Sequence, residues 1–156
     1  MASLIAVRST TIAFTTSRDP TREAVFVDSG AWIALALSRD PLHARAREQW
    51  DLLCAAGARL HTSVPVVIET FTFLDRNANR DVALAWKEWV TQSGALEILP
   101  CELRDLQRSW EYFRRSDLHK LSAVDATSFI IMKRARIRLA YTFDHHFAVV
   151  GFRMVT

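Results

Sequence analysis

The sequence predicts an α/β fold in which a mainly parallel sheet is covered by helices on both faces. Short runs rich in β-branched residues alternate along the chain with amphipathic helical segments, and this order is typical of parallel sheets. At Gly57 and again at Gly94, a glycine ends a helical segment just before a short strand. The chain has 156 residues, 50% of them apolar, which suits one domain with a sizeable core.

Five segments are predicted to be strands. The first is the apolar run Val25–Val27, which leads directly into Asp28 and a helix. The others are short apolar or β-branched runs bounded by glycine, proline or polar residues. The predicted strands are 25–27, 59–63, 96–99, 139–143 and 152–155.

Helical segments separate these strands, and each is recognised by apolar residues three or four positions apart. The fifth of them carries four large apolar residues on one face, namely Leu103, Leu106, Trp110 and Phe113. The predicted helices are 30–37, a segment from the Asp40–Pro41 cap to Gly57, 66–74, a segment from an Asp81 cap to Gly94, 102–113, a helix beginning at Ser122 or Ala123, and a short turn or helix at Asp144.

The first 23 residues differ from the rest and are predicted to form a poorly ordered tail, with one domain over residues 24–156. The tail is rich in Ser and Thr, and its apolar stretch is too short for a signal-peptide core. The apolar run 31–37 is also too short to span a bilayer, so no membrane partner is expected. Cys54 and Cys101 form no ligand pattern and are interpreted as buried free thiols in a reducing cytoplasm.

Charge and glycine content narrow the classes of function. The formal net charge is +3 and the basic residues are mostly arginine, which weakly indicates a phosphate-bearing partner. Only four glycines occur, and they cannot build a glycine-rich phosphate loop. P-loop and dinucleotide-binding proteins are therefore excluded.

Four acids stand in apolar or strand-end settings: Asp28, Glu69, Asp125 and Asp144. Each also has a purely structural interpretation, which stays open at this point. Asp28 and Asp144 follow strands and can cap the next turn, whereas Asp125 lies three residues after Ser122 in a capping-box pattern. Glu69 can face solvent, although an acid within an apolar helix is costly to bury without a partner.

The same four acids can also meet at one edge of the sheet. The carboxyl ends of parallel strands lie together there, and Glu69 can reach this edge from its helix. Such a cluster of carboxylates repels itself unless protons or cations bind. Oxygen ligands of this kind favour Mg²⁺ or Mn²⁺, and ions held in this way catalyse phosphodiester hydrolysis.

These motifs, taken in order, resemble the PIN-domain family, and most closely the VapC-type toxins of bacterial toxin–antitoxin pairs. The resemblance rests on residues 27–29, Glu69, 121–126, 142–147 and 151–152, and it covers about residues 24–156. It implies a three-layer α/β/α sandwich and an Mg²⁺- or Mn²⁺-dependent endoribonuclease. It also implies an RNA substrate, a cognate antitoxin and a homodimer.

The resemblance assigns roles to particular residues. Asp28, Glu69, Asp125 and Asp144 match the acidic quartet of the family. Thr142 and Ser29 would support the metal site, and Asp117 is treated as peripheral. By the same analogy, Trp32 and Leu35 could belong to an antitoxin groove, although helical tryptophans are more commonly core or dimer-interface residues.

Basic residues near the predicted site are candidates to bind RNA, because phosphates are held by arginine and lysine. The main candidates lie in the loop before the sixth helix, and those at the end of that helix are weaker because positive charge is favourable there anyway. His145 and His146 could touch phosphate or act in proton transfer, but a solvated turn is the favoured interpretation for this pair. The candidates are Arg114, Arg115, Lys120 and His119, followed by Lys133, Arg134, Arg136 and Arg138.

Two alternatives to the toxin remain. The domain could bind RNA or a protein without cutting, although the complete acidic quartet argues against this. It could also be an RNA maturation or decay nuclease with no antitoxin, because such enzymes share the same site.

Overall fold

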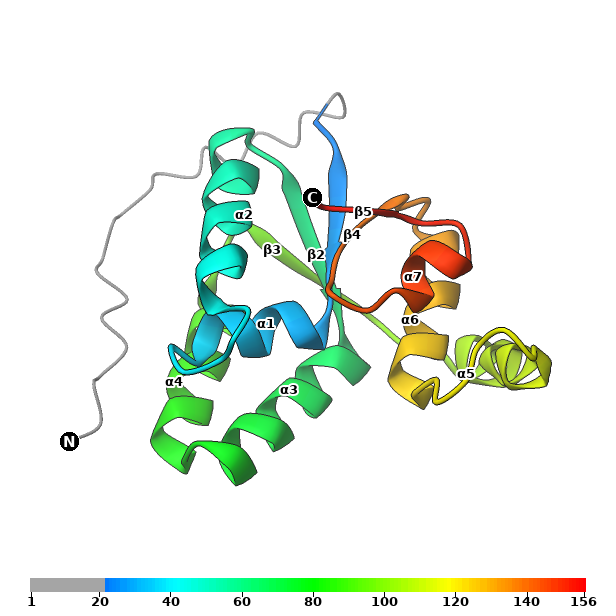
Figure 1. Cartoon of the computed structure of the whole chain (residues 1–156), viewed down its shortest axis with the longest axis horizontal. Helices are drawn as coiled ribbons and strands as arrows, with labels where there is room; N and C mark the ends of the chain where they lie inside the picture. The colour runs from blue at the N-terminus through cyan, green and yellow to red at the C-terminus, as the bar shows by residue number, and fades with distance from the viewer. Residues whose placement is uncertain (1–21) are drawn as a thin grey trace.

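A computed structural model describes residues 22–156 of the chain, so the predicted tail lies almost entirely outside the described residues. A single parallel sheet has the strand order β3-β2-β1-β4-β5. Because β1 lies at its centre, Asp28 leaves the sheet in its middle (Figure 1). The strands are β1 (Ala24–Val27), β2 (Arg59–Ser63), β3 (Leu96–Leu99), β4 (Leu139–Tyr141) and β5 (Arg153–Met154).

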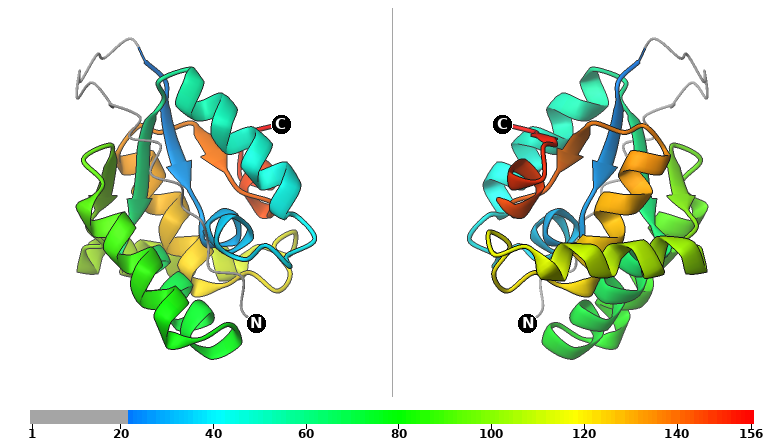
Figure 2. Two further views of the ribbon diagram at one scale, coloured as in Figure 1. Left: turned by 90° about the vertical axis from the view of Figure 1, so that its left-hand side faces the viewer. Right: turned by 90° about the vertical axis from the view of Figure 1, so that its right-hand side faces the viewer.

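Helices cover both faces of this sheet. Figure 2 shows α2 in front of the sheet in one view and α6 in front of it in the opposite view, which confirms the three-layer sandwich. The helices are α1 (Ser29–Ala36), α2 (His43–Ala55), α3 (Val64–Asn77), α4 (Arg80–Gln92), α5 (Leu103–Ser109), the 3₁₀ helix η1 (Trp110–Arg114), α6 (Ala123–Arg134) and α7 (His146–Val149).

The core on the α2 face is built around tryptophan. Trp32 of α1 is 2% exposed, and its ring centroid lies 5.4 Å from that of Trp50, 6.0 Å from Trp86 and 5.5 Å from Trp89. Its Nε1 donates a hydrogen bond of 3.3 Å to Thr62 Oγ1 on β2. These four tryptophans are therefore core residues, and Trp32 is too deeply buried to line an antitoxin groove.

The core on the α6 face is built around phenylalanine. The ring centroid of Phe129 lies 5.1 Å from Tyr112, 4.9 Å from Phe147 and 6.0 Å from Phe152. Phe129 and Phe147 are completely buried. This cluster ties η1, α6, α7 and the segment leading into β5 to one another, and so sets the position of the loop between β4 and α7.

Several element boundaries differ from the prediction for local reasons. The fourth helix begins two residues earlier than expected, because Asn79 rather than Asp81 is its N-cap and accepts a 2.9 Å hydrogen bond from the Val82 N–H. The predicted fifth helix is α-helical only to Ser109 and then tightens into η1. The fourth strand ends at Tyr141, because Thr142 turns its side chain toward Asp28.

Two basic side chains at the end of α6 hold α5 and η1 in place. Arg134 donates to both carboxylate oxygens of Asp105, at 3.1 and 2.9 Å, and also to the Pro100 carbonyl at 2.7 Å. Lys133 Nζ donates to the Tyr112 hydroxyl at 2.8 Å. Asp105 is only 1% exposed, so this ion pair is buried on its acidic side. These two residues, weak candidates for RNA contact, therefore have a structural role.

Replacing Arg134 with alanine should lower the free energy of unfolding by about 3 kcal/mol, because it leaves the Asp105 carboxylate buried without its cation. Chemical denaturation measures this change. The control is Arg138→Ala, a neighbouring exposed arginine, which should change stability by less than about 0.5 kcal/mol. Equal stability of the two variants would contradict the interpretation.

Candidate metal centre

Asp28 occupies the N-cap position of α1, directly after β1, and its carboxylate is almost fully buried at 3% exposure. The carboxylate makes no capping hydrogen bond. Thr142 Oγ1 donates to Asp28 Oδ2 at 3.0 Å, whereas Asp28 Oδ1 is buried and has no hydrogen-bond partner among residues 22–156. Helix capping therefore does not explain this acid, and one oxygen remains for a ligand.

Asp125 lies in the first turn of α6 and is held by the predicted capping box. Ser122 Oγ donates to Asp125 Oδ2 at 2.7 Å, and the Asp125 N–H donates back to Ser122 Oγ at 3.0 Å. The Ser122 N–H also donates to Oδ2, at 3.3 Å. The capping contacts all fall on Oδ2, so capping and a role for Oδ1 in the site are compatible.

Asp144 follows β4 in the turn before α7. Its N–H donates to Thr142 Oγ1 at 3.0 Å, so the Thr142 hydroxyl links the Asp28 carboxylate to the backbone of Asp144. The His146 N–H donates to Asp144 Oδ1 at 2.9 Å, and His146 Nδ1 lies 3.1 Å from Oδ2. His146 is buried and His145 is exposed, so only His145 fits the solvated turn.

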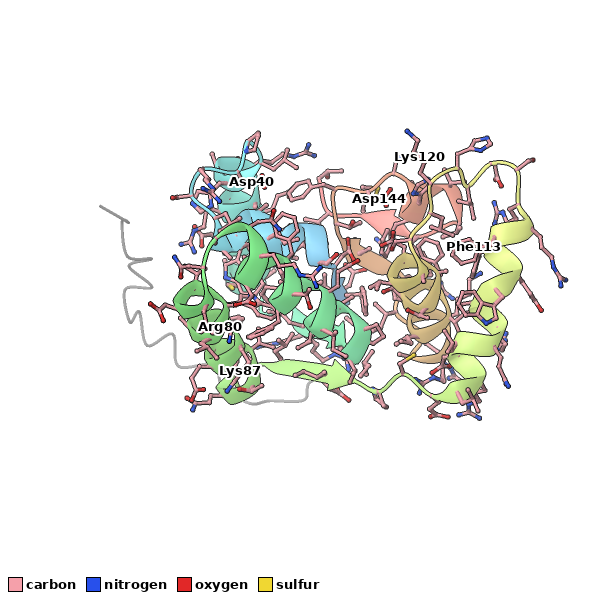
Figure 3. All side chains as sticks on the ribbon, turned by 90° about the horizontal axis from the view of Figure 1, so that it is seen from below. Asp40, Arg80, Lys87, Phe113, Lys120 and Asp144 are labelled. Carbon is pink, nitrogen blue, oxygen red and sulfur yellow. The ribbon has the colours of Figure 1, made fainter. Side chains whose placement is uncertain are left out.

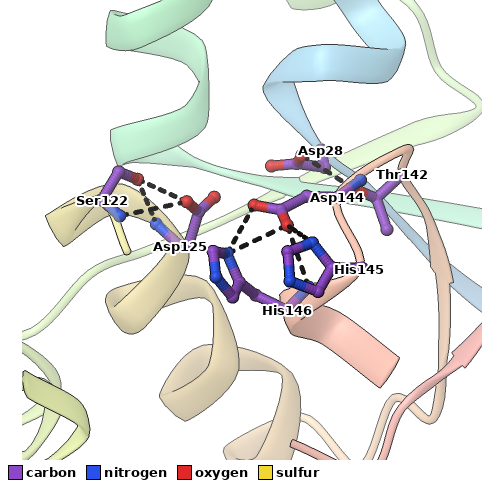
Figure 4. Close-up of polar contacts among 7 residues, drawn as sticks. All are labelled: Asp28, Ser122, Asp125, Thr142, Asp144, His145 and His146. Atoms are coloured by element: carbon purple, nitrogen blue, oxygen red, sulfur yellow. Dashed lines mark hydrogen bonds and ion pairs between the residues drawn. The ribbon is translucent and has the colours of Figure 1, made fainter. Parts of the chain in front are cut away.

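These acids line one cleft at the carboxyl edge of the sheet. Figure 4 shows the carboxylates of Asp28, Asp125 and Asp144 turned toward a shared space. Figure 3 looks onto this edge, with Asp144 between α1 and α6. The cleft has a volume of about 310 Å³ and is lined by Asp28, Ser29, Gly30, Ile33, Glu69, Phe73, Ser122, Asp125 and Asp144.

Glu69 reaches the cleft from α3, which packs against α1, α4 and α6 below the sheet (Figure 1). The side chain is partly buried within an otherwise apolar stretch of α3. Its charge also acts on two other acids, because it raises the pKa of both Asp28 and Asp125. The structure therefore brings all four predicted acids together.

Mutual repulsion and burial shift the titration of these acids. Burial, with the nearby charge of Asp125, raises the pKa of Asp28 from 3.8 to about 7. Burial also raises the pKa of Asp125, and the charges of Asp144 and Glu69 add to this effect. A carboxylate with a pKa near 7 is poorly stabilised by the protein alone, which is the condition under which a bound cation is most favourable.

The donor set fits a hard divalent cation. Asp28 Oδ1 is a buried, unpartnered carboxylate oxygen, and the acids around it also offer only oxygen atoms. Oxygen-only sites favour Mg²⁺ or Mn²⁺ over zinc. Asp144, His145 and His146 also offer ligand atoms within 4.8 Å of one another, but the His146 imidazole is already directed at Asp144. The residues present therefore fit a magnesium or manganese ion held mainly by carboxylates.

The basic candidates lie outside this cleft. Arg115 pairs with Asp117 through contacts of 3.0 and 2.6 Å, so Asp117 serves a surface ion pair and is not in the acid cluster. Arg114 ends η1, and Lys120 lies two residues before Ser122 with a φ of 59°. Both are exposed and form no ion pair with any residue of the described part of the chain.

The sequence prediction missed one residue at the site. His146 contacts Asp144 directly, yet the sequence favoured a solvated turn for the histidine pair. The sequence did carry a signal, because His146 directly precedes the large apolar residue Phe147. In the structure Phe147 is buried in the core, and His146 begins the same short helix, α7. An exposed position for both histidines would require the turn to leave the core.

Comparison with known proteins identifies the family. Residues 25–153 match the PIN domain. The chain is 32% identical over 128 residues to the 23S rRNA-specific endonuclease VapC20 of Mycobacterium tuberculosis, covering 82% of this chain and 95% of that protein. The crystal structure of VapC20, described as a sarcin–ricin loop cleaving toxin, superposes with a TM-score of 0.72 over the same shares.

Two more distant structures share the fold. DNA-bound VapBC from Salmonella typhimurium gives a TM-score of 0.58, and FitAcB from Neisseria gonorrhoeae gives 0.60. Both are 14% identical, and the match covers 85% of this chain and 96% of the matched chain. The match to the PIN domain over most of the sequence and the similarity to VapC20 show that this chain belongs to the PIN-domain family.

Proposed function

We propose that the protein is an Mg²⁺- or Mn²⁺-dependent endoribonuclease that hydrolyses RNA phosphodiester bonds as the toxin of a toxin–antitoxin pair. The observation that carries this proposal is the buried, unpartnered Oδ1 of Asp28 within a cleft of four acids. A cluster this acidic is unfavourable without a cation, and its oxygen ligands are those of metal-dependent phosphodiesterases.

The residues of the cleft have separable roles in this proposal. Asp28, Asp125 and Asp144 hold the metal, and Glu69 completes the site or orients a water molecule from α3. The bound ion would lower the pKa of water and stabilise the charge that develops on the phosphate oxygens. Thr142 fixes the Asp28 carboxylate by hydrogen bonding, and Ser29 lines the cleft next to it. The protein thus presents carboxylate oxygens whose orientation is set before any ligand arrives.

The substrate class follows from similarity and charge. VapC20 is named for cleavage of 23S rRNA, and its similarity to this chain extends over nearly the whole domain. We infer that a structured ribosomal RNA is the substrate here. Arg114, Arg115 and Lys120 would contact the RNA backbone, with Lys120 nearest in sequence to the Ser122–Asp125 cap.

The same comparisons support a proposal for the partners of this chain. The structures of VapBC and FitAcB share this fold, and the resemblance of this chain to VapC-type toxins supports the proposal of a cognate antitoxin and a homodimeric toxin. No helix within residues 22–156 has the length and apolar character to cross a bilayer. Cys54 and Cys101 are half-buried and form no disulfide, as suits the reducing cytoplasm in which we place the activity.

Removal of one of the carboxylates that would hold the metal should abolish RNA cleavage. Asp28→Asn keeps the size and burial of the side chain but weakens metal binding, so cleavage of ribosomal RNA in Mn²⁺ should fall by about 100-fold or more. Gel electrophoresis of the RNA, after incubation of purified ribosomes or ribosomal RNA with the protein, measures this cleavage. EDTA should abolish cleavage by the wild type.

The matched control for that assay is Asp117→Asn, which neutralises an acid outside the cleft. It should keep near wild-type activity. Full activity of Asp28→Asn would refute the metal assignment. RNA binding without cleavage by refolded, antitoxin-free wild type would favour the non-catalytic module.

The raised pKa of Asp28 predicts an unusual pH dependence of stability. Between about 4 and 7 the metal-free folded protein holds a proton on Asp28 that the unfolded chain releases, so stability should fall as the pH rises through this range. In EDTA at pH 8, Asp28→Asn should therefore be more stable than wild type by a few kcal/mol.

The measurement is urea unfolding at pH 5 and pH 8. The advantage of Asp28→Asn should shrink at pH 5, and Mn²⁺ should stabilise wild type at pH 8 but not the variant. A variant less stable than wild type at pH 8 in EDTA would show that the carboxylate is satisfied without a metal.

His146 should act as a positioning residue for Asp144. Its two contacts fix the carboxylate, and loss of such an outer contact typically weakens metal binding 10- to 100-fold. His146→Phe removes the imidazole contact and keeps the backbone one, and it should raise the Mn²⁺ dissociation constant by about this factor in calorimetry. His145→Ala should have a much smaller effect, because the His145 imidazole is exposed and its contact with Asp144 Oδ1 is longer, at 3.5 Å. The same affinity in wild type and His146→Phe would remove His146 from this role.

A further inference from the structure

The cleft that contains the four acids also has an apolar wall, which the metal chemistry proposed above does not use. Ile33 of α1 and Phe73 of α3 line the cleft together with the acids. Phe73 is 38% exposed and Ile33 is partly buried, and neither is part of the hydrophobic core of residues 22–156. These two side chains are therefore presented to the cleft rather than to the interior.

Helical spacing places this wall directly beside the acids. Phe73 lies four positions after Glu69 on α3, and Ile33 lies four positions after Ser29 on α1. Residues four positions apart lie on the same face of a helix, one turn from each other, so each apolar side chain follows a polar residue of the cleft. Because α1 packs against α3 (Figure 1), the wall is continuous with the carboxylates.

A positive charge lies at the end of the same face of α3. Arg76 follows Phe73 by three positions and Glu69 by seven, which is two helical turns, and its side chain is exposed. The neighbouring acid Asp75 is already paired with Arg80, through hydrogen bonds of 2.8 and 3.1 Å. The face of α3 thus carries, in order, a carboxylate, an aromatic ring and a guanidinium group.

We propose that Phe73 is a stacking platform for the RNA base next to the scissile phosphate, with Ile33 as the apolar wall beside it. This rests on the nuclease proposed above, because a phosphate bound at the carboxylates brings the base of its own nucleotide to the adjoining wall. An aromatic ring accepts any base, since every base has a flat π face. Arg76 contacts a further phosphate of the same strand.

This assignment defines which nucleotides the site accepts. A base that is paired and stacked within a helix shows a protein only its edges, so its face cannot lie on Phe73. The cleft volume of about 310 Å³ is at the lower end of the roughly 300–1,000 Å³ that is typical of small-ligand sites, which suits a single nucleotide. The substrate therefore presents an unpaired nucleotide, in a loop, a bulge or a single strand.

Exposure of a phenylalanine does not by itself mark such a subsite. Phe113 is 46% exposed, but it lies outside the cleft, and its ring packs against Trp110 at a centroid distance of 5.8 Å. Phe73 differs because it lines the cleft one helical turn from Glu69. The proposal therefore depends on the position of the ring beside the acids, and Phe113 provides the matched comparison.

Fluorescence anisotropy with two labelled dodecamers tests the subsite without requiring cleavage. One dodecamer is oligoadenylate, and the other has a stable abasic sugar at every position. In Ca²⁺, another hard cation that takes oxygen ligands, wild type should bind oligoadenylate about 10-fold more tightly, because only this strand can stack. Phe73→Ala should remove this difference by weakening the binding of oligoadenylate alone. Gel electrophoresis confirms that both strands stay intact.

Further variants separate stacking from the other contributions to binding. Phe73→Trp keeps a π face and should retain the preference for oligoadenylate, whereas Phe73→Leu keeps only apolar volume and should lose it. Arg76→Gln should weaken the binding of both strands by a similar factor, because it removes a phosphate contact. Phe113→Ala should change neither dissociation constant. Circular dichroism confirms that each variant is folded.

Three results would overturn the base platform. These are equal binding of the two strands by wild type, binding of neither strand, and the same affinity of wild type and Phe73→Ala for oligoadenylate. A failure of the nuclease is distinguishable from these results. If wild type does not cleave RNA in Mn²⁺ but keeps its Phe73-dependent preference for bases, the nuclease is refuted and the platform stands.

Discussion

The hydrogen bond from Thr142 to Asp28 is the contact on which the site depends. It joins the ends of β1 and β4, the neighbouring strands at the centre of the sheet, and leaves the second oxygen of Asp28 buried and unpartnered. The same hydroxyl accepts the N–H of Asp144, so one side chain positions two acids. An uncompensated carboxylate is tolerated here because the surrounding fold is rigid and a cation can complete it.

That rigidity comes from two aromatic cores on opposite faces of the sheet. The tryptophan cluster around Trp32 holds α1 at the end of β1 and thereby fixes Asp28. The phenylalanine cluster around Phe129 and Phe147 holds α6 against the β4–α7 turn and thereby fixes Asp125 and Asp144. The repulsion among the acids is therefore resisted by packing on both sides of the sheet, which keeps the carboxylate oxygens in place.

The segment α5–η1 differs from these two cores, because polar contacts rather than apolar packing hold its buried side. Its buried side is polar because Arg134 and Lys133 satisfy Asp105 and Tyr112 from α6, and its apolar side is exposed. Buried ion pairs often contribute more to the specificity of an orientation than to stability. Here the pair selects which face of the segment is presented outward, next to the helix that carries Asp125.

The sequence alone determined the α/β class, the positions of the five strands within one or two residues and the four acids, because strand-end acids and hydrophobic periodicity are local signals. It also placed the capping box of Ser122 and Asp125. Tertiary structure decided the remainder. The outward turn of Leu103, Trp110 and Phe113 depends on an ion pair between residues 29 positions apart, and the burial of His146 depends on the packing of its neighbour Phe147. Periodicity shows that a helix has two faces, but only the partners available across the fold determine which face is buried.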